Sequence, residues 1–300
     1  PFDVLFANNG GYPGAWGTLA ALWAGSSLGL RTRLLLVHHE AMGRGPLRHI
    51  FESLLDLGVQ HWATDLVAVS RATRSTLMER RGFYAYLNPI RVIHNGVDMS
   101  ADADTLTVDL RAQLAIPADS FVVGMVGRLE RYKGHEDLIL ALGELPSNTI
   151  SQVVVVFVGG GSLAERERLQ SVAQKIGVAS QVRFAGYIEG SIGALMCQFD
   201  LLAMLTKDFE GFGLTIAEAM WAGTPVLATM VGAVPEFVSE DVAILVPPES
   251  PDEIADALLR VISNGEEAQQ RAIRAKQHIS KYNGQAMGKK FHRMLLVSGE

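Results

Sequence analysis

The chain has 300 residues, 48% of them hydrophobic and 19% charged, which is enough for a large core and more than one domain usually holds. Its 26 basic and 32 acidic residues give a net charge of −6, which excludes a general attraction to nucleic acid or anionic lipid. The single cysteine, Cys197, excludes an intrachain disulfide and a cysteine-based metal cluster within one chain, and it indicates a reducing, cytoplasmic compartment.

The first third of the chain predicts four strands, at 2–7, 32–38, 66–70 and 91–94. An apolar run at 14–30 is interrupted by four glycines and two serines and falls short of the roughly 20 residues of a membrane span, so we interpret it as a buried helix. The chain starts directly in a strand-like run, without a methionine or a signal-peptide pattern. We therefore expect that upstream residues are missing and that the first domain is incomplete.

A histidine pair, His38 and His39, ends the second predicted strand. Histidine is a natural polar contact at a strand end that faces a cleft. Taken alone, the pair is better explained by a structural histidine.

Residues 98–120 are rich in Asp, Ala and Ser and contain no strong strand pattern, which indicates a connection between two domains. We predict a first domain over 1–97 and a second over 98–282, with a C-terminal helix at 283–300 that returns to the first. The Asp-x-Asp of 101–104 falls in the connection and not at a strand end, so we do not expect it to bind a metal.

The second region predicts six more strands that alternate with helices, including two helices at 251–263 and 265–280. This alternation is typical of βαβ units, and runs of Val, Ile and Leu indicate strands buried on both faces. The strand candidates are 121–127, 153–159, 182–186, 201–205, 225–229 and 243–246. The predicted fold class is α/β, with two Rossmann-like doubly wound parallel-sheet domains.

The first chemical motif follows the strand that ends at Gly127. Its polar loop carries Arg128 and Lys133 before Gly134 admits the next helix. Ligands of open α/β sheets bind beyond the carboxyl ends of strands, where two fixed positive charges can neutralise a diphosphate. A solvated basic loop explains the segment equally well.

A triple glycine, Gly159 to Gly161, follows the next strand, but the G-x-G-x-x-G spacing of dinucleotide-binding sites fails because position 164 is alanine. Ser162 and Glu165 have the spacing of a helix-capping box. Phosphate binding by this turn is therefore the less favoured interpretation.

The most informative segment is "DFEGFGLTIAEAM" at 208–220. Gly211 and Gly213 leave N–H groups uncovered at the positive end of a helix, and Glu210 lies at the loop tip. Glu218 follows about one turn into the helix. Thr215 and Glu218 also match a capping box that needs no ligand, but this alternative does not explain Glu210.

These segments together resemble the family 4 glycosyltransferases, retaining nucleotide-sugar-dependent enzymes of GT-B fold. The resemblance covers essentially the whole chain, in order and approximate spacing. The segments are "LVAVSRATRSTL" (66–77), "VIHNGVD" (92–98), "VGRLERYKG" (126–134), "VVFVGGG" (155–161), "VRFAGYI" (182–188) and "EGFGLTIAEAMWAGTPVLAT" (210–229).

The resemblance implies that Glu210 meets hydroxyls of the transferred sugar and that Glu218 holds the ribose. It implies that N–H groups of Gly211, Phe212, Gly213 and Leu214 contact sugar or diphosphate, and that Arg128 and Lys133, after Gly127, stabilise the leaving diphosphate. The donor-facing histidine is His38 or His39, with His38 preferred from strand register. Tyr187 and Ile188 are expected near the nucleotide base. The implied reaction needs no enzyme nucleophile, no metal and no further cofactor.

The expected function is therefore transfer of a hexosyl group from a UDP-, GDP- or ADP-sugar to a glycan, lipid or small-molecule acceptor, as in glycan biosynthesis. The alternative is a truncated or degenerate nucleotide-sugar-binding protein without turnover. A glycosidase with Glu210 and Glu218 as its two carboxylates, or a nicotinamide dehydrogenase, ranks well behind. No nucleic-acid partner is expected, and a lipid-linked acceptor would bring the protein to the inner membrane face.

Overall fold

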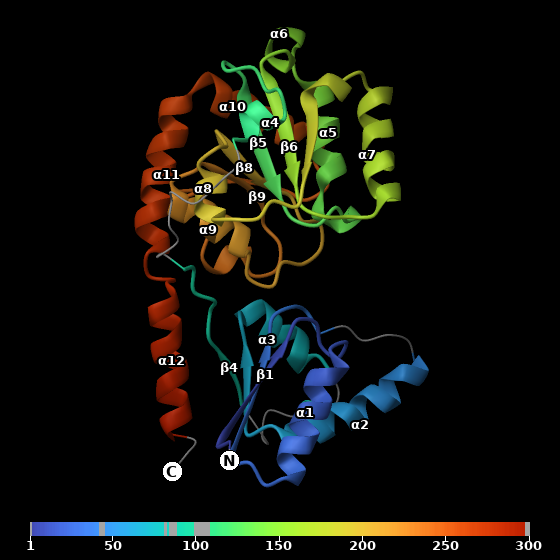
Figure 1. Ribbon diagram of the computed structural model, residues 1–300, viewed down its shortest axis with the longest axis vertical. Helices are drawn as coiled ribbons and strands as arrows, with labels where there is room; N and C mark the ends of the chain where they lie inside the picture. The colour runs from blue at the N-terminus through green and yellow to red at the C-terminus, as the bar shows by residue number, and fades with distance from the viewer. Residues whose placement is uncertain (1, 42–45, 81–82, 84–88, 99–108, 298–300) are drawn as a thin grey trace. The chain divides into compact units, whose positions relative to one another are not determined.

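A computed structural model gives the structure of the chain (Figure 1) and describes residues 2–41, 46–80, 83, 89–98 and 109–297. The Asp-x-Asp of 101–104 lies outside these residues. The chain divides into two compact units. Unit 1 comprises Pro1–Gly96, Phe209–Phe212 and Tyr282–Glu300, and unit 2 comprises Val97–Asp208 and Gly213–Lys281. The short segment Phe209–Phe212 thus groups with unit 1, whereas the sequence interpretation placed it within one continuous second domain.

Unit 1 is built on a parallel four-stranded sheet with strand order β1-β2-β3-β4. Its elements are β1 (Val4–Asn9), α1 (Trp16–Ser27), β2 (Thr32–Val37), α2 (Pro46–Trp62), β3 (Asp65–Ala68), α3 (Arg71–Met78), β4 (Ile90–Val92) and α12 (Gly284–Val297). All four strands predicted in this region are present, within two residues of the expected ends.

The first helix of unit 1 differs from its prediction in burial. Leu19 and Leu22 of α1 are buried in the core, but Trp16 and Trp23 are 52% and 55% exposed. Helix α1 therefore packs along one side only, because it covers a single face of the sheet. On α12, the ring of Phe291 packs edge-on against Phe6 of β1, with ring centroids 5.3 Å apart.

Unit 2 is built on a parallel six-stranded sheet with strand order β10-β9-β8-β5-β6-β7. Its strands are β5 (Phe121–Val126), β6 (Val153–Val158), β7 (Val182–Gly186), β8 (Leu201–Met204), β9 (Val226–Thr229) and β10 (Ile244–Val246). Its helices are α4 (Leu110–Gln113), α5 (His135–Glu144), α6 (Ser147–Ile150), α7 (Leu163–Lys175), α8 (Ile192–Met196), α9 (Leu214–Ala222), α10 (Pro251–Ser263) and α11 (Gly265–Ile279), with 3₁₀ turns η1 (Arg131–Lys133), η2 (Ala179–Gln181) and η3 (Val234–Glu236).

Two groups of helices enclose this sheet (Figure 1). Helix α5 packs against α7 and α10, and α9 packs against α8 and α11. All six residues of β6 are buried, as expected of a Val-rich central strand covered on both faces. The six predicted strands and the α/β fold class are confirmed.

The strand order of unit 2 reverses between β5 and β8. From β5 the chain continues outward through β6 and β7, and it then returns to the other side of β5 for β8, β9 and β10. Loops that follow β5 and β8 therefore leave the same edge of the sheet on opposite sides of a switch point, the place where open α/β sheets bind ligands.

No helix in the part of the chain that the structure describes is long and apolar enough to cross a membrane.

Candidate functional site

The loop after β5 places two basic residues at the switch point of unit 2. Arg128 follows Gly127, and its side chain is 71% exposed and paired with Glu130. Lys133 ends the 3₁₀ turn η1, with its ammonium 5.1 Å from the ring centroid of Tyr132. Both residues predicted to meet a diphosphate are thus carried by one short loop at the carboxyl end of a central strand.

The triple glycine after β6 is explained by close packing against this loop. A side chain on Gly159 would lie 2.0 Å from the carbonyl oxygen of Gly127, and one on Gly161 would lie 2.5 Å from the Leu129 side chain. The Leu129 N–H also donates to the Gly160 carbonyl. Ser162 caps α7 by accepting from the Glu165 N–H at 3.1 Å, as its spacing predicts.

The loop after β8 begins beside the loop after β5. Gly134 adopts a left-handed conformation, with φ of 82°, and a side chain there would lie 2.1 Å from the carbonyl oxygen of Leu205. The Lys207 N–H donates to the Tyr132 carbonyl at 2.7 Å. Thr206 is fully buried, and its carbonyl accepts from the Thr229 hydroxyl at 2.6 Å. These contacts fix the start of the second loop within unit 2.

Helix α9 begins at Leu214 and has a glycine as its N-cap. Gly213 is left-handed, with φ of 90°, and no side chain caps the helix. The capping-box interpretation of Thr215 and Glu218 is therefore wrong, because Thr215 already lies inside the helix. The N–H groups of the first turn remain without a side-chain cap, at the end where the helix dipole favours an anion.

Glu218 lies in the fifth position of α9 and is partly buried. Within the described residues, its carboxylate makes no hydrogen bond or ion pair. Burial alone raises the pKa of Glu218 to about 7. A half-buried carboxyl group without a protein partner is suited to accept hydrogen bonds from the hydroxyl groups of a ligand.

The other glutamate, Glu210, belongs to the segment Phe209–Phe212 that groups with unit 1. There the backbone of Gly211 approaches that of His38, because a side chain on Gly211 would lie 2.0 Å from the His38 carbonyl oxygen. The rings of His39 and Phe209 lie 5.4 Å apart. The end of β2 and the glutamate-bearing segment thus lie together.

The two histidines differ in their surroundings. The Nε2 atom of His38 is buried and has no hydrogen-bond partner among the described residues, and desolvation lowers the pKa of the ring. His39 instead packs its ring against Phe209.

Two further aromatic groups hold the segment that contains Glu210. The ring centroid of Phe212 lies 5.9 Å from that of His94 and 6.1 Å from that of Tyr282. Phe212 is 2% exposed. Its predicted role rested on its backbone N–H, and the structure adds that its side chain anchors the segment.

Tyr187 and Ile188 follow β7 at the carboxyl-end edge of the sheet, where the loops after β5 and β8 also start. The Tyr187 side chain is 79% exposed, and Ile188 is half-buried. No group of three or more His, Cys, Asp or Glu side chains in the described part of the chain is arranged to hold a metal ion.

The model of the group 1 glycosyl transferases matches residues 108–278, and the model of glycosyltransferase family 4 matches residues 1–101. The first match spans more than half of the chain and contains the two basic residues, the glycine-capped helix and both glutamates. The chain belongs to the group 1 glycosyl transferases.

Among curated relatives, this glycosyl transferase chain is 34% identical to a D-inositol 3-phosphate glycosyltransferase of Corynebacterium jeikeium over 223 residues, which cover 71% of the chain and 53% of the relative. It is 29% identical to an uncharacterized glycosyltransferase of Methanocaldococcus jannaschii over 180 residues, 58% of the chain and 45% of the relative. The chain thus spans about half the length of the curated relatives it matches.

Among solved structures, Anabaena HepE in complex with UDP-glucose is similar, with a TM-score of 0.83 and 25% identity over 98% of this chain and 79% of that one. The sucrose-phosphate synthase of Thermosynechococcus elongatus shares the fold, with a TM-score of 0.79 and 23% identity over 99% of this chain and 74% of that one. Both units therefore have the architecture of GT-B glycosyltransferases.

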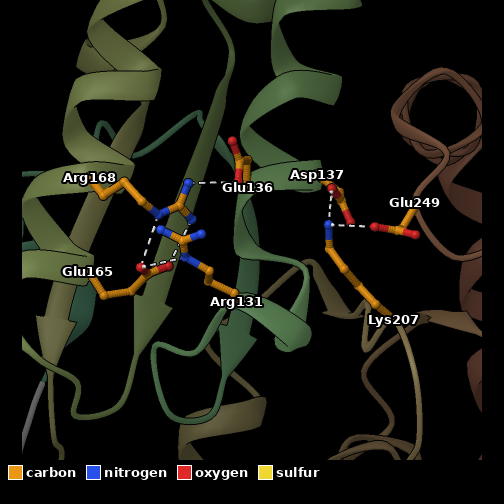
Figure 2. A network of polar contacts seen from close by, with 7 residues as sticks. All are labelled: Arg131, Glu136, Asp137, Glu165, Arg168, Lys207 and Glu249. Carbon is orange, nitrogen blue, oxygen red and sulfur yellow. Dashed lines mark hydrogen bonds and ion pairs between the residues drawn. The ribbon is translucent and has the colours of Figure 1, made fainter.

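Sequence reasoning did not single out Lys207, which lies beside the candidate site in this glycosyl transferase chain. Its ammonium binds Asp137 at 3.0 Å and Glu249 at 3.3 Å (Figure 2). The three residues are up to 112 positions apart in the sequence, so no local pattern signals the cluster.

Proposed function

We propose that the protein transfers a hexosyl group from a nucleotide-diphosphate sugar to an acceptor with retention of the anomeric configuration. The observation that carries this proposal is the switch point of unit 2. There the loop with Arg128 and Lys133 lies beside the segment that leads into the glycine-capped N-terminus of α9. This edge thus presents two basic side chains and a row of helix N–H groups, which suits a diphosphate.

The loops after β5, β7 and β8 and the start of α9 bind the nucleotide in this proposal. Arg128 and Lys133 neutralise the diphosphate, with Gly127 opening their loop. N–H groups from Gly211 to Leu214 donate to its oxygens or to the sugar. The Glu218 carboxylate accepts the ribose hydroxyls, which gives its unpaired oxygens two donors. The loop of Tyr187 and Ile188 meets the base.

Residues grouped with unit 1 bind the transferred sugar. Glu210 accepts sugar hydroxyls, and His38 faces the donor from the end of β2. The orphaned Nε2 of His38 supports this choice over His39, whose ring packs against Phe209. A ligand hydroxyl would satisfy a buried ring nitrogen that otherwise destabilises the fold.

The acceptor hydroxyl attacks the anomeric carbon on the face from which the diphosphate leaves. The bond from that carbon to the diphosphate oxygen breaks, and a diphosphate oxygen takes the acceptor proton. No enzyme nucleophile is needed, and two basic side chains supply the positive charge, so the proposal includes no metal. Positioning and charge stabilisation provide most of the rate enhancement.

The acceptor is a glycan, a lipid-linked group or a small molecule. The relatives named D-inositol 3-phosphate glycosyltransferases make an inositol phosphate the first acceptor to test. In this proposal the reaction takes place in the cytoplasm, and a lipid-linked acceptor would add peripheral contact with the inner membrane face.

The test is turnover with defined donors. UDP-glucose, UDP-N-acetylglucosamine, GDP-mannose and ADP-glucose are incubated with the chain, with and without D-inositol 3-phosphate. Released nucleoside diphosphate is measured, and the proton coupling of the new anomeric centre reports its configuration. Acceptor-dependent release with retention supports the proposal. Inversion overturns the retaining reaction, and donor binding without release of diphosphate identifies a binding protein instead.

A further inference from the structure

Three contacts tie the segment Leu205–Lys207 to the segment Tyr132–Asp137. The Lys207 N–H donates to the Tyr132 carbonyl at 2.7 Å. Gly134 has no room for a side chain against the Leu205 carbonyl. The third contact is the ion pair from the Lys207 ammonium to Asp137 in the first turn of α5, at 3.0 Å (Figure 2).

The ion pair is well shielded from water. The side chains of Lys207 and Asp137 are 19% and 6% exposed, whereas Glu249, the second partner of Lys207, is 69% exposed. Asp137 also keeps one oxygen, Oδ2, buried without a partner among the described residues. Shielding makes the pair with Asp137 the stronger of the two, because solvent screens the exposed carboxylate of Glu249.

The ion pair lies at one end of the segment that carries Glu210. Lys207 immediately precedes the segment Asp208–Gly213, which carries Glu210 and ends at the N-cap of α9. Asp137 lies four residues after Lys133 on the rigid start of α5. The pair therefore fixes one end of the glutamate-bearing segment to the helix that follows the basic loop.

We propose that Lys207 and Asp137 are positioning residues, whose ion pair sets the register of Asp208–Gly213 so that Glu210 and the neighbouring N–H groups meet the donor sugar. The contact with the donor sugar rests on the proposed function. The effect of the ion pair on the position of Asp208–Gly213 does not require a ligand. Lys207 acts through the segment and does not touch the donor, since two carboxylates already bind its ammonium.

The chain offers a matched control in the adjacent residue. Glu136 also lies in the first turn of α5 and forms an ion pair, with Arg168 of α7 at 2.7 Å (Figure 2). Glu136→Gln and Asp137→Asn remove the same charge from the same helix end. Both therefore weaken the favourable interaction with the helix dipole to a similar extent. Only Asp137→Asn releases the segment after β8.

The first measurement is amide hydrogen exchange of the ligand-free chain, followed by mass spectrometry. We expect Lys207→Met and Asp137→Asn to speed exchange at 208–213 by about tenfold, because local opening becomes easier. Exchange in the strands of unit 2 should not change, and Glu136→Gln should leave 208–213 as in the wild type. Unchanged exchange at 208–213 in both variants overturns the proposal.

The second measurement is calorimetric binding of UDP, GDP or ADP, whichever the wild type binds, and of its glucose conjugate. We expect Lys207→Met to leave nucleotide affinity within about twofold and to lower the conjugate's affinity by about tenfold, since a misplaced segment loses the sugar contacts. A charge swap, Lys207→Asp with Asp137→Lys, should restore part of the loss. Equal loss for nucleotide and conjugate, as for Lys133→Ala, would make Lys207 a direct diphosphate ligand and overturn its positioning role.

The two measurements separate this inference from the proposed function. Faster exchange at 208–213 in a chain that binds none of these ligands supports the register role of the pair and refutes the donor site. Binding of a ligand together with unchanged exchange at 208–213 supports the donor site and refutes the register role of the pair.

Discussion

At the scale of single residues, the shielded carboxyl group of Glu218 is better explained by binding of a ligand than by a contribution to fold stability. The carboxyl group is largely shielded, its pKa is raised to about 7 by desolvation, and no described side chain donates to it. In the proposed site the ribose hydroxyls donate to the ionised carboxylate, which is a stronger acceptor than the neutral acid. Binding of a nucleotide sugar should therefore release a proton wherever Glu218 is protonated in the empty site.

This proton release predicts the pH dependence of donor affinity. The affinity for a nucleotide sugar should be constant above pH 7 and fall below it by up to about tenfold per pH unit, because the raised pKa keeps Glu218 protonated there. Nucleotide sugars are the right probe, since their diphosphate has no second ionisation near neutral pH. Calorimetry between pH 5.5 and 8.5 tests the slope. Glu218→Gln should bind more weakly with a flat profile, and a slope that survives in this variant would refute the assignment.

Glu210 and Lys133 carry the chemistry of the proposal, and both lie on loops. Glu210→Gln and Lys133→Ala should lower turnover by about 10²–10³-fold, because each removes a group that stabilises charge or position in the transition state. The unfolding midpoint in urea should stay within experimental error of the wild type. Glu240→Gln and Lys175→Ala, on exposed side chains of unit 2, are the controls. Wild-type turnover in either site variant would remove that residue from the site.

At the scale of elements, the close approach of two loops depends on one glycine. Gly134 and Gly177 have nearly the same left-handed φ, 82° and 80°, but a side chain meets the Leu205 carbonyl only at Gly134. Gly177→Ala should lose about 1 kcal/mol of unfolding free energy from the backbone conformation alone. Gly134→Ala should lose about 3 kcal/mol, since overlap adds to the same strain. Urea unfolding measures both, and equal losses would show that the contact contributes nothing.

Buried ion pairs join helix α2 of unit 1 to the residues that follow α3. Arg80, just beyond α3, binds Asp56 of α2 at 2.9 Å and Glu52 at 3.3 Å, and the Tyr12 hydroxyl donates to Asp56 at 2.7 Å. Arg80→Met leaves two shielded carboxylates without a cation.

We expect Arg80→Met to destabilise the fold by about 3–5 kcal/mol. Arg91→Met is the control, because Arg91 is 45% exposed and lies 3.9 Å from Asp65. Its loss should be below about 1 kcal/mol. Urea unfolding of both variants checks the difference, and similar small losses would show that the buried network adds no stability.

The sequence predicted these elements well where a local pattern determines them. Short apolar runs located all ten predicted strands. The pattern is clearest in β6, because a strand buried on both faces needs apolar residues at nearly every position. The capping box at Thr215 was wrong because Gly213, in a left-handed conformation, starts α9 earlier than the side-chain pattern suggests. The apolar run at 14–30 correctly predicted a helix but not its exposed tryptophans, since burial depends on the packing partner.

At the scale of the whole molecule, the motifs of this group 1 glycosyl transferase were readable in the sequence, whereas their connections were not. Arg128 and Lys133 are local to one loop, so the sequence alone places them together. The ion pair of Lys207 with Asp137 joins residues 70 positions apart, and only the strand order that places β8 next to β5 brings them together. Long-range register of this kind is set by the fold and has no local signal.

The donor site is best tested by calorimetric titration of the chain with UDP, GDP and ADP and their glucose conjugates, beside the Lys133→Ala variant. We expect saturable binding of one nucleotide and its conjugate, weakened by about tenfold or more in Lys133→Ala, which lacks a charge-assisted contact to the diphosphate. Absence of binding by the folded chain, or binding that Lys133→Ala leaves unchanged, would contradict a donor site at the switch point of unit 2.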